Sequence, residues 1–188
     1  MDRAPKVELR PLATEDRDRL RAWRNLPAVR RWMFTDHEIS EAEHAAWFAR
    51  TMAEPRRRHW IIVADGEPVG LIHLYDIDPV ARRGTWGFYV ADERMRGKGI
   101  GAAAHYAVID KAFGEFDLHK LWSETVADNK AVIALHETFG FTREAVFREH
   151  MQKDGRWIDV LGFGLLAGDW AVRRGAVRDQ LAARGFEV

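Results

Sequence analysis

The sequence predicts an α+β fold in which a mixed, mostly antiparallel sheet is flanked by helices. Short segments in which apolar and polar residues alternate indicate strands, and glycine-containing turns join several of them. Other segments have helical spacing and begin with capping residues. Strands come first and are followed by alternating strands and helices, an order that favours a mixed sheet between helices.

The N-terminal third is predicted to contain one strand and two helices. Residues 6–12 (KVELRPL) alternate as a strand does. Thr14 is expected to cap a helix that ends near Asn25, before a proline. Ser40, with a glutamate three residues later, forms a capping box for a second helix that ends near Pro55.

The remaining elements follow from turn and cap residues. Residues 59–77 indicate two strands joined at Asp65-Gly66, because this dipeptide accepts the positive φ of a tight hairpin. After it we expect a strand at 85–91, a helix ending near Phe113, a strand at 120–126, a helix at 128–139 capped by Asp128 and ended by Gly140, and a hairpin around 153–155.

Length and composition limit the classes of function. The 188 residues suit one domain, 1–188, whose residues 168–188 form a helical tail. Lys+Arg and Asp+Glu both count 29, so no overall basic field favours nucleic acid or a membrane as partner. Cysteine is absent and the eight histidines are dispersed, so no metal site is expected. The N-terminal residues lack an apolar signal-peptide core, and we expect a soluble, cytoplasmic protein.

Residues 94–101 (RMRGKGIG) predict an anion site. Three glycines and three basic residues stand between a predicted strand and a predicted helix. Backbone N–H groups can surround a phosphate there, since glycine lets it approach the backbone and the helix N-terminus is positive. The Walker A pattern fails because no Gly-Lys is followed by Ser or Thr. The dinucleotide pattern matches Gly97, Gly99 and Ala102, but lies mid-chain behind antiparallel hairpins.

The loop also satisfies R-x-x-G-x-[GA], through Arg94, Gly97 and Gly99, and here the chain resembles the GNAT superfamily of acetyl-CoA-dependent N-acetyltransferases. A second segment, DNKAVIALHETFGF, is similar to that family's N-x-x-A…GF segment, with Asn129 and Phe141 in place. Two separate motifs in the right order are stronger evidence than either alone. The resemblance, over about residues 60–166, implies a seven-stranded GNAT sheet with a V-shaped splay between its fourth and fifth strands.

The resemblance implies acetyl-CoA as cosubstrate and no metal. The backbone of the fourth strand would pair with the pantetheine arm, the glycine loop would hold the pyrophosphate, and an asparagine would hydrogen-bond the arm from the other side. The implied cofactor residues are Phe88, Tyr89, Val90, Arg94, Met95, Arg96, Gly97, Lys98, Gly99, Ile100, Gly101 and Asn129.

Two residues are catalytic candidates. Glu124 could take the proton of the attacking amine, or could instead pair with Arg or Lys on a neighbouring strand. An unpaired N–H near Tyr89 could bind the developing oxyanion. Many family members have tyrosine seven residues after the helix asparagine, where this chain has His136; it either protonates the departing thiolate or is merely packed.

By the GNAT resemblance, residues 23–48 correspond to the helices that wall the acceptor side; they are rich in Trp, Phe and Met, which either line that side or pack in the core. They resemble the N-terminal part of the acetyltransferases of pseudaminic acid synthesis, which implies UDP-4-amino-4,6-dideoxy-N-acetyl-β-L-altrosamine as acceptor, in a route to flagellin glycosylation. By this resemblance Met33 and Phe34 would pack against uracil, with His37, Tyr75 and Phe88 as further lining candidates.

Two other functions remain open. Acetyltransferases of ribosomal-protein N-termini have similar helix-rich N-terminal regions, and their acceptor is an extended peptide. A non-catalytic acyl-CoA-binding module would keep the loop without the chemistry. The apolar residues 160–166 (VLGFGLL) could pair with a second subunit, so a homodimer is a further expectation.

Overall fold

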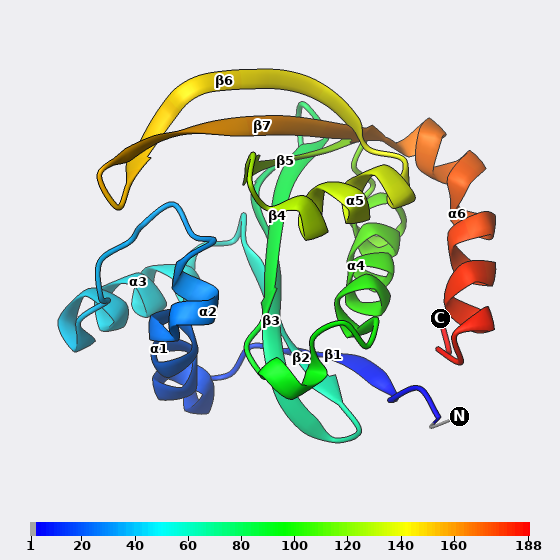
Figure 1. The fold of residues 1–188 in the computed structure, drawn as a ribbon. Helices are drawn as coiled ribbons and strands as arrows, with labels where there is room; N and C mark the ends of the chain where they lie inside the picture. Colours follow the sequence, from blue (N-terminus) through cyan, green and yellow to red (C-terminus); the bar gives the residue numbers. More distant parts are fainter. Residues whose placement is uncertain (1–2) are drawn as a thin grey trace.

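The computed structural model describes residues 3–188, which form a seven-stranded sheet with strand order β1-β2-β3-β4-β5-β7-β6 (Figure 1). The strands β4 and β5 run parallel, whereas the other neighbours are antiparallel. This confirms the predicted α+β class and GNAT-type sheet. The strands are β1 (Val7–Pro11), β2 (Arg58–Ala64), β3 (Glu67–Asp78), β4 (Arg83–Val90), β5 (Lys120–Val126), β6 (Thr142–Lys153) and β7 (Arg156–Leu166).

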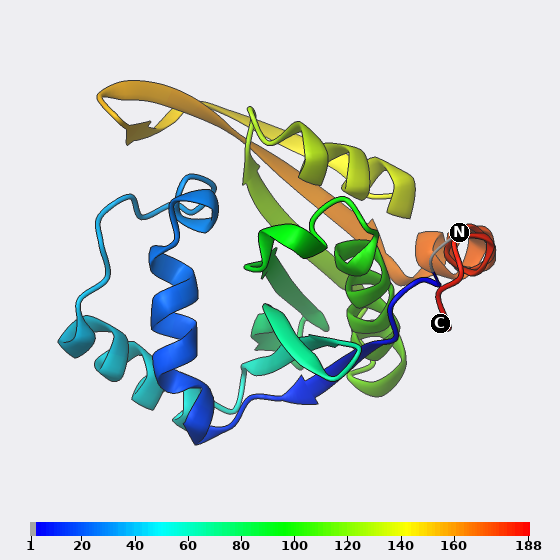
Figure 2. The same ribbon diagram turned by 60° about the horizontal axis from the view of Figure 1, so that its bottom comes forward.

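Helices cover the sheet in two groups, seen on opposite sides of the strands in Figure 2. The N-terminal group is α1 (Arg17–Asn25), α2 (Pro27–Arg30) and α3 (Glu41–Ala53). The second group is α4 (Ile100–Asp110), α5 (Lys130–Phe139) and α6 (Ala167–Ala183), with a π-helical extension of α4 at Lys111–Glu115. Of the described residues, no helix combines the length and the apolar character needed to cross a membrane.

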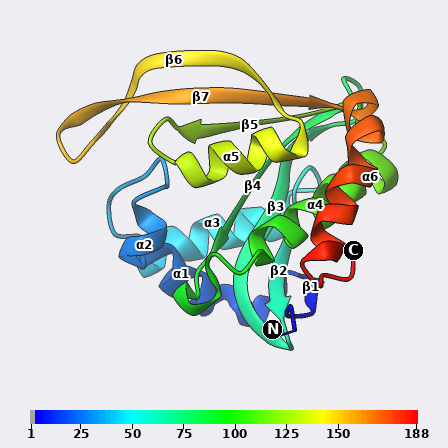
Figure 3. The same cartoon turned by 45° about the vertical axis from the view of Figure 1, so that its right-hand side comes forward.

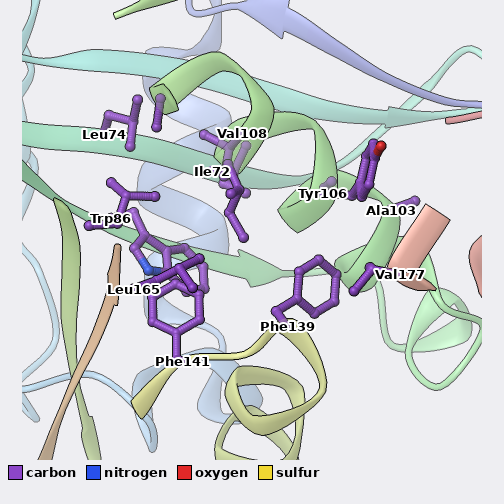
Figure 4. Packing of buried hydrophobic residues seen from close by; sticks show 14 of the residues in the cluster. Ile72, Leu74, Trp86, Ala103, Tyr106, Val108, Phe139, Phe141, Leu165 and Val177 are labelled. Carbon is purple, nitrogen blue, oxygen red and sulfur yellow. The ribbon is translucent and has the colours of Figure 1, made fainter. Parts of the chain in front are cut away.

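Strand alternation divides the buried residues between the two groups. Ile61, Val63 and Leu71 pack with α1 and α3, whereas Trp60, Ile62 and Ile72 face the larger core under the other helices. Successive side chains of a strand point to opposite faces of the sheet, so alternate residues of β2 and β3 pack against one group of helices or the other. Figure 4 shows the larger core, in which Trp86 lies near Phe141 and Leu165.

The sheet opens between β4 and β5, as predicted. The two strands pair only from Arg83 to Thr85 with Lys120 to Trp122. Within the described chain, the later part of β4 continues to pair with β3, and the later part of β5 with β7. Because each strand keeps its outer neighbour, the two diverge and leave a gap between them.

Three details of the elements differ from the prediction. Thr14 lies in a 3-10 turn, and the buried Asp16 organises this start instead, because its carboxylate accepts the Ala13 N–H at 3.0 Å. Asn129 rather than Asp128 caps α5, since its side-chain oxygen accepts the Val132 N–H at 3.3 Å. Helix α2 was not predicted, because it has four residues and begins at a proline that we expected only to end α1.

The β6–β7 hairpin extends past the rest of the sheet toward the N-terminal helices (Figure 3). Its turn is Asp154-Gly155, with φ of 48° and 74°, as the sequence predicts. Residues 160–166 lie in β7, between β5 and β6. The backbone of β7 therefore cannot pair with a second subunit, because β5 and β6 already lie on its two sides; β6 is the edge strand at this end of the sheet.

Candidate active site

A cavity of about 480 Å³ lies where the N-terminal helices meet the gap between β4 and β5. Helices α1, α3 and α5, strands β3, β4 and β5 and the loop after α2 all contribute to its wall. Eight of the residues predicted from sequence line it: Met33, Phe34, Tyr75, Phe88, Tyr89, Glu124, Asn129 and His136. The two catalytic candidates therefore share one cavity with most of the acceptor candidates.

The other predicted residues lie outside this wall. His37 is on the rim, where its Nε2 lies 3.0 Å from Oε1 of Glu43, a residue that does line the cavity. Val90, the last residue of β4, lies beyond the cavity, as do residues 94–101, which run from the loop after β4 into the first turn of α4. The cavity and the glycine loop are thus two parts of one surface, joined through β4.

The glycine loop has the backbone geometry that an anion site requires. Gly99 caps α4 with a φ of 91°, and Gly97 has a φ of 75°, both in the left-handed region that favours glycine. A side chain at Gly101 would meet the ring of Phe88 at 2.9 Å, so the helix start lies directly against β4. The first N–H groups of a helix have no partner within it, and here they lie at the loop.

The basic side chains of the loop are partly engaged. Arg94 forms two hydrogen bonds to Asp92, at 2.7 and 3.0 Å. Arg96 donates to the Val90 carbonyl oxygen from Nε and from an Nη, both at 3.1 Å. Arg96 therefore fixes the loop to the end of β4. It also occupies the Val90 carbonyl oxygen, which is the group that would accept a hydrogen bond from an extended ligand lying along β4.

The register of β3 and β4 shows which backbone groups face the gap. Ala91 donates its N–H to the Val69 carbonyl, and the pairing continues as Leu71 with Tyr89. Hydrogen-bonded pairs alternate along an antiparallel ladder, so the Tyr89 N–H points to β3. The N–H groups that face the gap belong to its neighbours Phe88 and Val90.

Glu124 is half-buried in β5, at the gap and on the cavity wall. Across residues 3–188, no side chain forms an ion pair or a hydrogen bond with its carboxylate. The basic residue at the start of the same strand, Lys120, pairs with Glu144 instead, at 2.7 Å. This carboxylate is thus available to a ligand, which favours the base over the ion-pair partner among the two readings of Glu124.

His136 lies on α5, is 1% exposed, and forms a hydrogen-bonded pair with Ser123 of β5. Its Nδ1 lies 2.7 Å from the Val132 carbonyl oxygen, which can only accept, so Nδ1 carries the proton. Nε2 then accepts from the Ser123 hydroxyl at 2.6 Å. Burial lowers the pKa of His136 to about 4, so the ring is neutral at pH 7.

Residues 6–142 match the family described as "Acetyltransferase (GNAT) domain". This range covers well over half of the chain. The chain belongs to the GNAT acetyltransferase family. This GNAT protein is accordingly an acetyltransferase, as the two sequence motifs predicted.

Relatives of this GNAT chain act on different amines. It is 26% identical over 161 residues to the spermidine N(1)-acetyltransferase of Escherichia coli (strain K12), covering 86% of each chain. It is 32% identical over 134 residues to the L-methionine sulfoximine/L-methionine sulfone acetyltransferase of Pseudomonas paraeruginosa, covering 68% of this chain and 75% of that protein. A solved structure of spermidine N-acetyltransferase from Vibrio cholerae, in complex with CoA and spermine, has a TM-score of 0.81 at 21% identity, covering 88% and 98% of the two chains.

Several residues of this GNAT cavity were missed by the sequence analysis. Arg24, His44 and Ser123 line it, but none of them was named as a site residue. The signal for Arg24 was present, since it lies in residues 23–48, the segment predicted to form the acceptor side, next to the predicted helix end. Ser123 could not be found in this way, because its partner His136 lies on another element.

One contact links the wall of this GNAT cavity to the distant β6–β7 hairpin. Lys153 is 6% exposed, and its Nζ donates to the carbonyl oxygens of Arg30 at 3.0 Å and Met33 at 2.6 Å. Burial lowers the pKa of Lys153. The hairpin thereby holds the loop that carries Met33 and Phe34 on the cavity wall.

Proposed function

We propose that this GNAT enzyme transfers the acetyl group of acetyl-CoA to the primary amine of a small molecule bound in the cavity, by direct attack within a ternary complex. One observation carries the proposal: an unpaired carboxylate, Glu124, lies where the cavity meets the β4–β5 gap. The gap offers backbone N–H groups on one side and the carboxylate on the other. Both are needed for acyl transfer from a thioester.

The residues present fit acetyl-CoA. The left-handed Gly97 and Gly99 and the N-terminus of α4 suit the pyrophosphate, with Lys98 and the neighbouring arginines at the rim. Asn129 uses its side-chain oxygen as the α5 cap, so its amide N–H groups remain for the pantetheine arm. When bound, acetyl-CoA supplies the thioester carbonyl. The family and the CoA in the Vibrio cholerae structure support this assignment.

The chemistry then divides between a side chain and a backbone N–H group. Glu124 takes a proton from the acceptor ammonium, and the neutral nitrogen forms a bond to the thioester carbonyl carbon. The N–H of Phe88 or Val90 donates to the carbonyl oxygen as negative charge develops there. As the carbon–sulfur bond breaks, the second proton lost by the nitrogen goes to the sulfur, and Glu124 returns its proton to solvent.

We propose that His136 acts through Ser123. In its neutral form the ring has no proton on Nε2, the nitrogen nearest Ser123, whereas the Ser123 hydroxyl lines the cavity. The hydroxyl has one proton, which Nε2 accepts in this arrangement, so it can donate to the departing sulfur only after it turns away from His136. His136 would then orient Ser123, and the role that the sequence suggested for the histidine alone belongs to the pair.

The variant His136→Phe is expected to lower kcat about tenfold and to leave the affinity for acetyl-CoA unchanged. Ser123→Ala should have a similar effect, and the double variant should be little worse than either, because coupled residues are not additive. Steady-state kinetics with a titration of acetyl-CoA measures this. Unchanged kcat in both single variants would remove the pair from the mechanism.

The small amine replaces the nucleotide sugar as our proposed acceptor. The resemblance to the enzymes of pseudaminic acid synthesis rests on the N-terminal segment, and His37 of that segment is engaged with Glu43 on the rim. The relatives reported above are named for a polyamine and for amino acid derivatives. The comparisons therefore do not support the UDP-4-amino sugar.

The test is release of free thiol from acetyl-CoA by the purified protein. Spermidine, L-methionine sulfone, the UDP-4-amino sugar and a peptide beginning with Ala or Ser serve as separate acceptors, with a reaction lacking amine as control. We expect release with at least one small amine and none without amine. Release with the peptide alone would indicate a protein N-terminal acetyltransferase. Binding of acetyl-CoA without release in any reaction would indicate the non-catalytic module.

A further inference from the structure

Arg24 is a cation in the cavity wall that has no charged partner among residues 3–188. It stands in the last turn of α1, next to the loop that carries Thr35. One guanidinium nitrogen donates to the Thr35 hydroxyl, and another, Nη1, is buried and has no hydrogen-bond partner in the described part of the chain. A buried donor that lacks a partner costs free energy, and a charged one costs more.

The surroundings of Arg24 do not neutralise it. Glu43 also lines the cavity, but its two carboxylate oxygens lie 3.0 and 3.1 Å from Nε2 of His37. Among the residues that the structure describes, no carboxylate comes within ion-pair distance of Arg24. The C-terminal end of α1 supplies only a fraction of an elementary charge. Burial lowers the pKa of Arg24, because removal from water disfavours the charged guanidinium.

We infer that the acceptor carries an anionic group, a carboxylate or a phosphate, in addition to its amine, and that Arg24 binds this group. The inference rests on the proposed acetyl transfer. The cavity wall then offers a separate partner for each charge of the acceptor. Glu124 on β5 receives the amine at the gap, and Arg24 on α1 receives the anion beside Thr35. A guanidinium is suited to both anions because its N–H groups match their paired oxygens.

This arrangement disfavours a bare polyamine. Spermidine has several ammonium groups and no anion, so one of them would have to approach the unpaired guanidinium in a half-buried cavity. Like charges in such a place repel strongly, since water screens them less than at an open surface. A zwitterion, in contrast, supplies one partner for Glu124 and one for Arg24.

The test compares acceptors that differ only in the anion. L-Methionine sulfone is compared with its carboxamide, and O-phosphoethanolamine with ethanolamine, each with acetyl-CoA and the full-length protein. We expect kcat/KM to be at least about tenfold higher for the anionic member of one pair, as for a charged hydrogen bond. The pair that shows the preference identifies carboxylate or phosphate. Equal values within both pairs would overturn the inference.

Two variants assign the preference to Arg24. Arg24→Gln should remove the preference for the anionic acceptor. We expect kcat/KM to fall about tenfold for the anionic acceptor of the pair and less than about threefold for the neutral one. The control is Arg21→Gln, one turn earlier on α1 and away from the cavity wall. This variant should retain the preference for the anionic acceptor. A preference that survives in Arg24→Gln would overturn the assignment. If that variant does not fold, Arg24→Lys replaces it and is expected to reduce the preference while keeping the charge.

The two proposals fail in different ways. Acetylation of neutral and anionic amines at equal rates leaves the acetyltransferase function standing and removes the role of Arg24. A preference for spermidine as acceptor would likewise leave the acetyltransferase function standing and remove the role of Arg24. Absence of thiol release with every amine overturns both.

Discussion

Glu124→Gln is expected to lower kcat/KM for the acceptor amine by about 100-fold or more at pH 7, the usual contribution of a general base. Glutamine keeps the shape of the side chain and cannot accept the ammonium proton. The loss should shrink as pH rises, because a growing fraction of the amine is then neutral without help. Measuring kcat/KM from pH 7 to the highest pH at which the protein is stable tests both statements.

The matched control is Glu137→Gln on α5, where the side chain is 62% exposed and outside the cavity wall. This change should leave kcat/KM within about twofold of the parent enzyme, as expected for an exposed ion pair at 3.9 Å. A Glu124→Gln deficit that stays constant across pH would point to a role in binding or folding rather than in proton transfer.

Acidification is expected to destabilise the protein strongly between pH 6.5 and about 4. His105 and His136 are 0% and 1% exposed. Burial lowers the pKa of His136 to about 4 and that of His105 well below 6.5. In this window the unfolded chain binds protons that the folded chain does not, so the free energy of unfolding falls as pH falls. Each histidine contributes about 1.4 kcal/mol per pH unit, a large share of a typical total of roughly 5–15 kcal/mol.

Denaturant unfolding at several pH values from 7.5 to 4.5 measures this slope. His105 is the best residue to change, because neither ring nitrogen has a hydrogen-bond partner and its ring lies 3.9 Å from that of Trp86 and 4.4 Å from that of Phe139. His105→Leu should flatten the pH dependence, whereas His119→Leu, at an exposed site, should leave it unchanged. An identical slope in the parent and in His105→Leu would exclude His105 as a cause.

Local patterns in the sequence predicted most of the fold. Asp65-Gly66 and Asp154-Gly155 located both hairpin turns, since few residue pairs accept positive φ in succession. Gly140 ended α5 in the left-handed conformation, as expected. The errors occurred where neighbours compete for one role. Asp128 and Asn129 are both good caps, and only the path of the chain decides between them.

The candidate site was less accessible to sequence reasoning. The glycine loop and Asn129 belong to local motifs and were found. Contacts between distant segments leave no local pattern, so the Ser123–His136 pair and the environment of Arg24 could not be predicted. A residue's charge is visible in a sequence, but whether that charge lacks a partner depends on the packing of several elements.

The hydrogen bonds of Lys153 mean that the proposed acceptor wall is built by two segments far apart in the sequence, the loop after α2 and the β6–β7 hairpin. The family match ends at residue 142, whereas the lysine that holds Arg30 and Met33 comes 11 residues later, at the tip of the hairpin. We therefore expect cofactor binding and acceptor choice to be separable in this enzyme. Exchanging the tip of the β6–β7 hairpin would alter which amines fit while leaving the glycine loop as it is, so the hairpin is the natural segment to transplant when redesigning specificity.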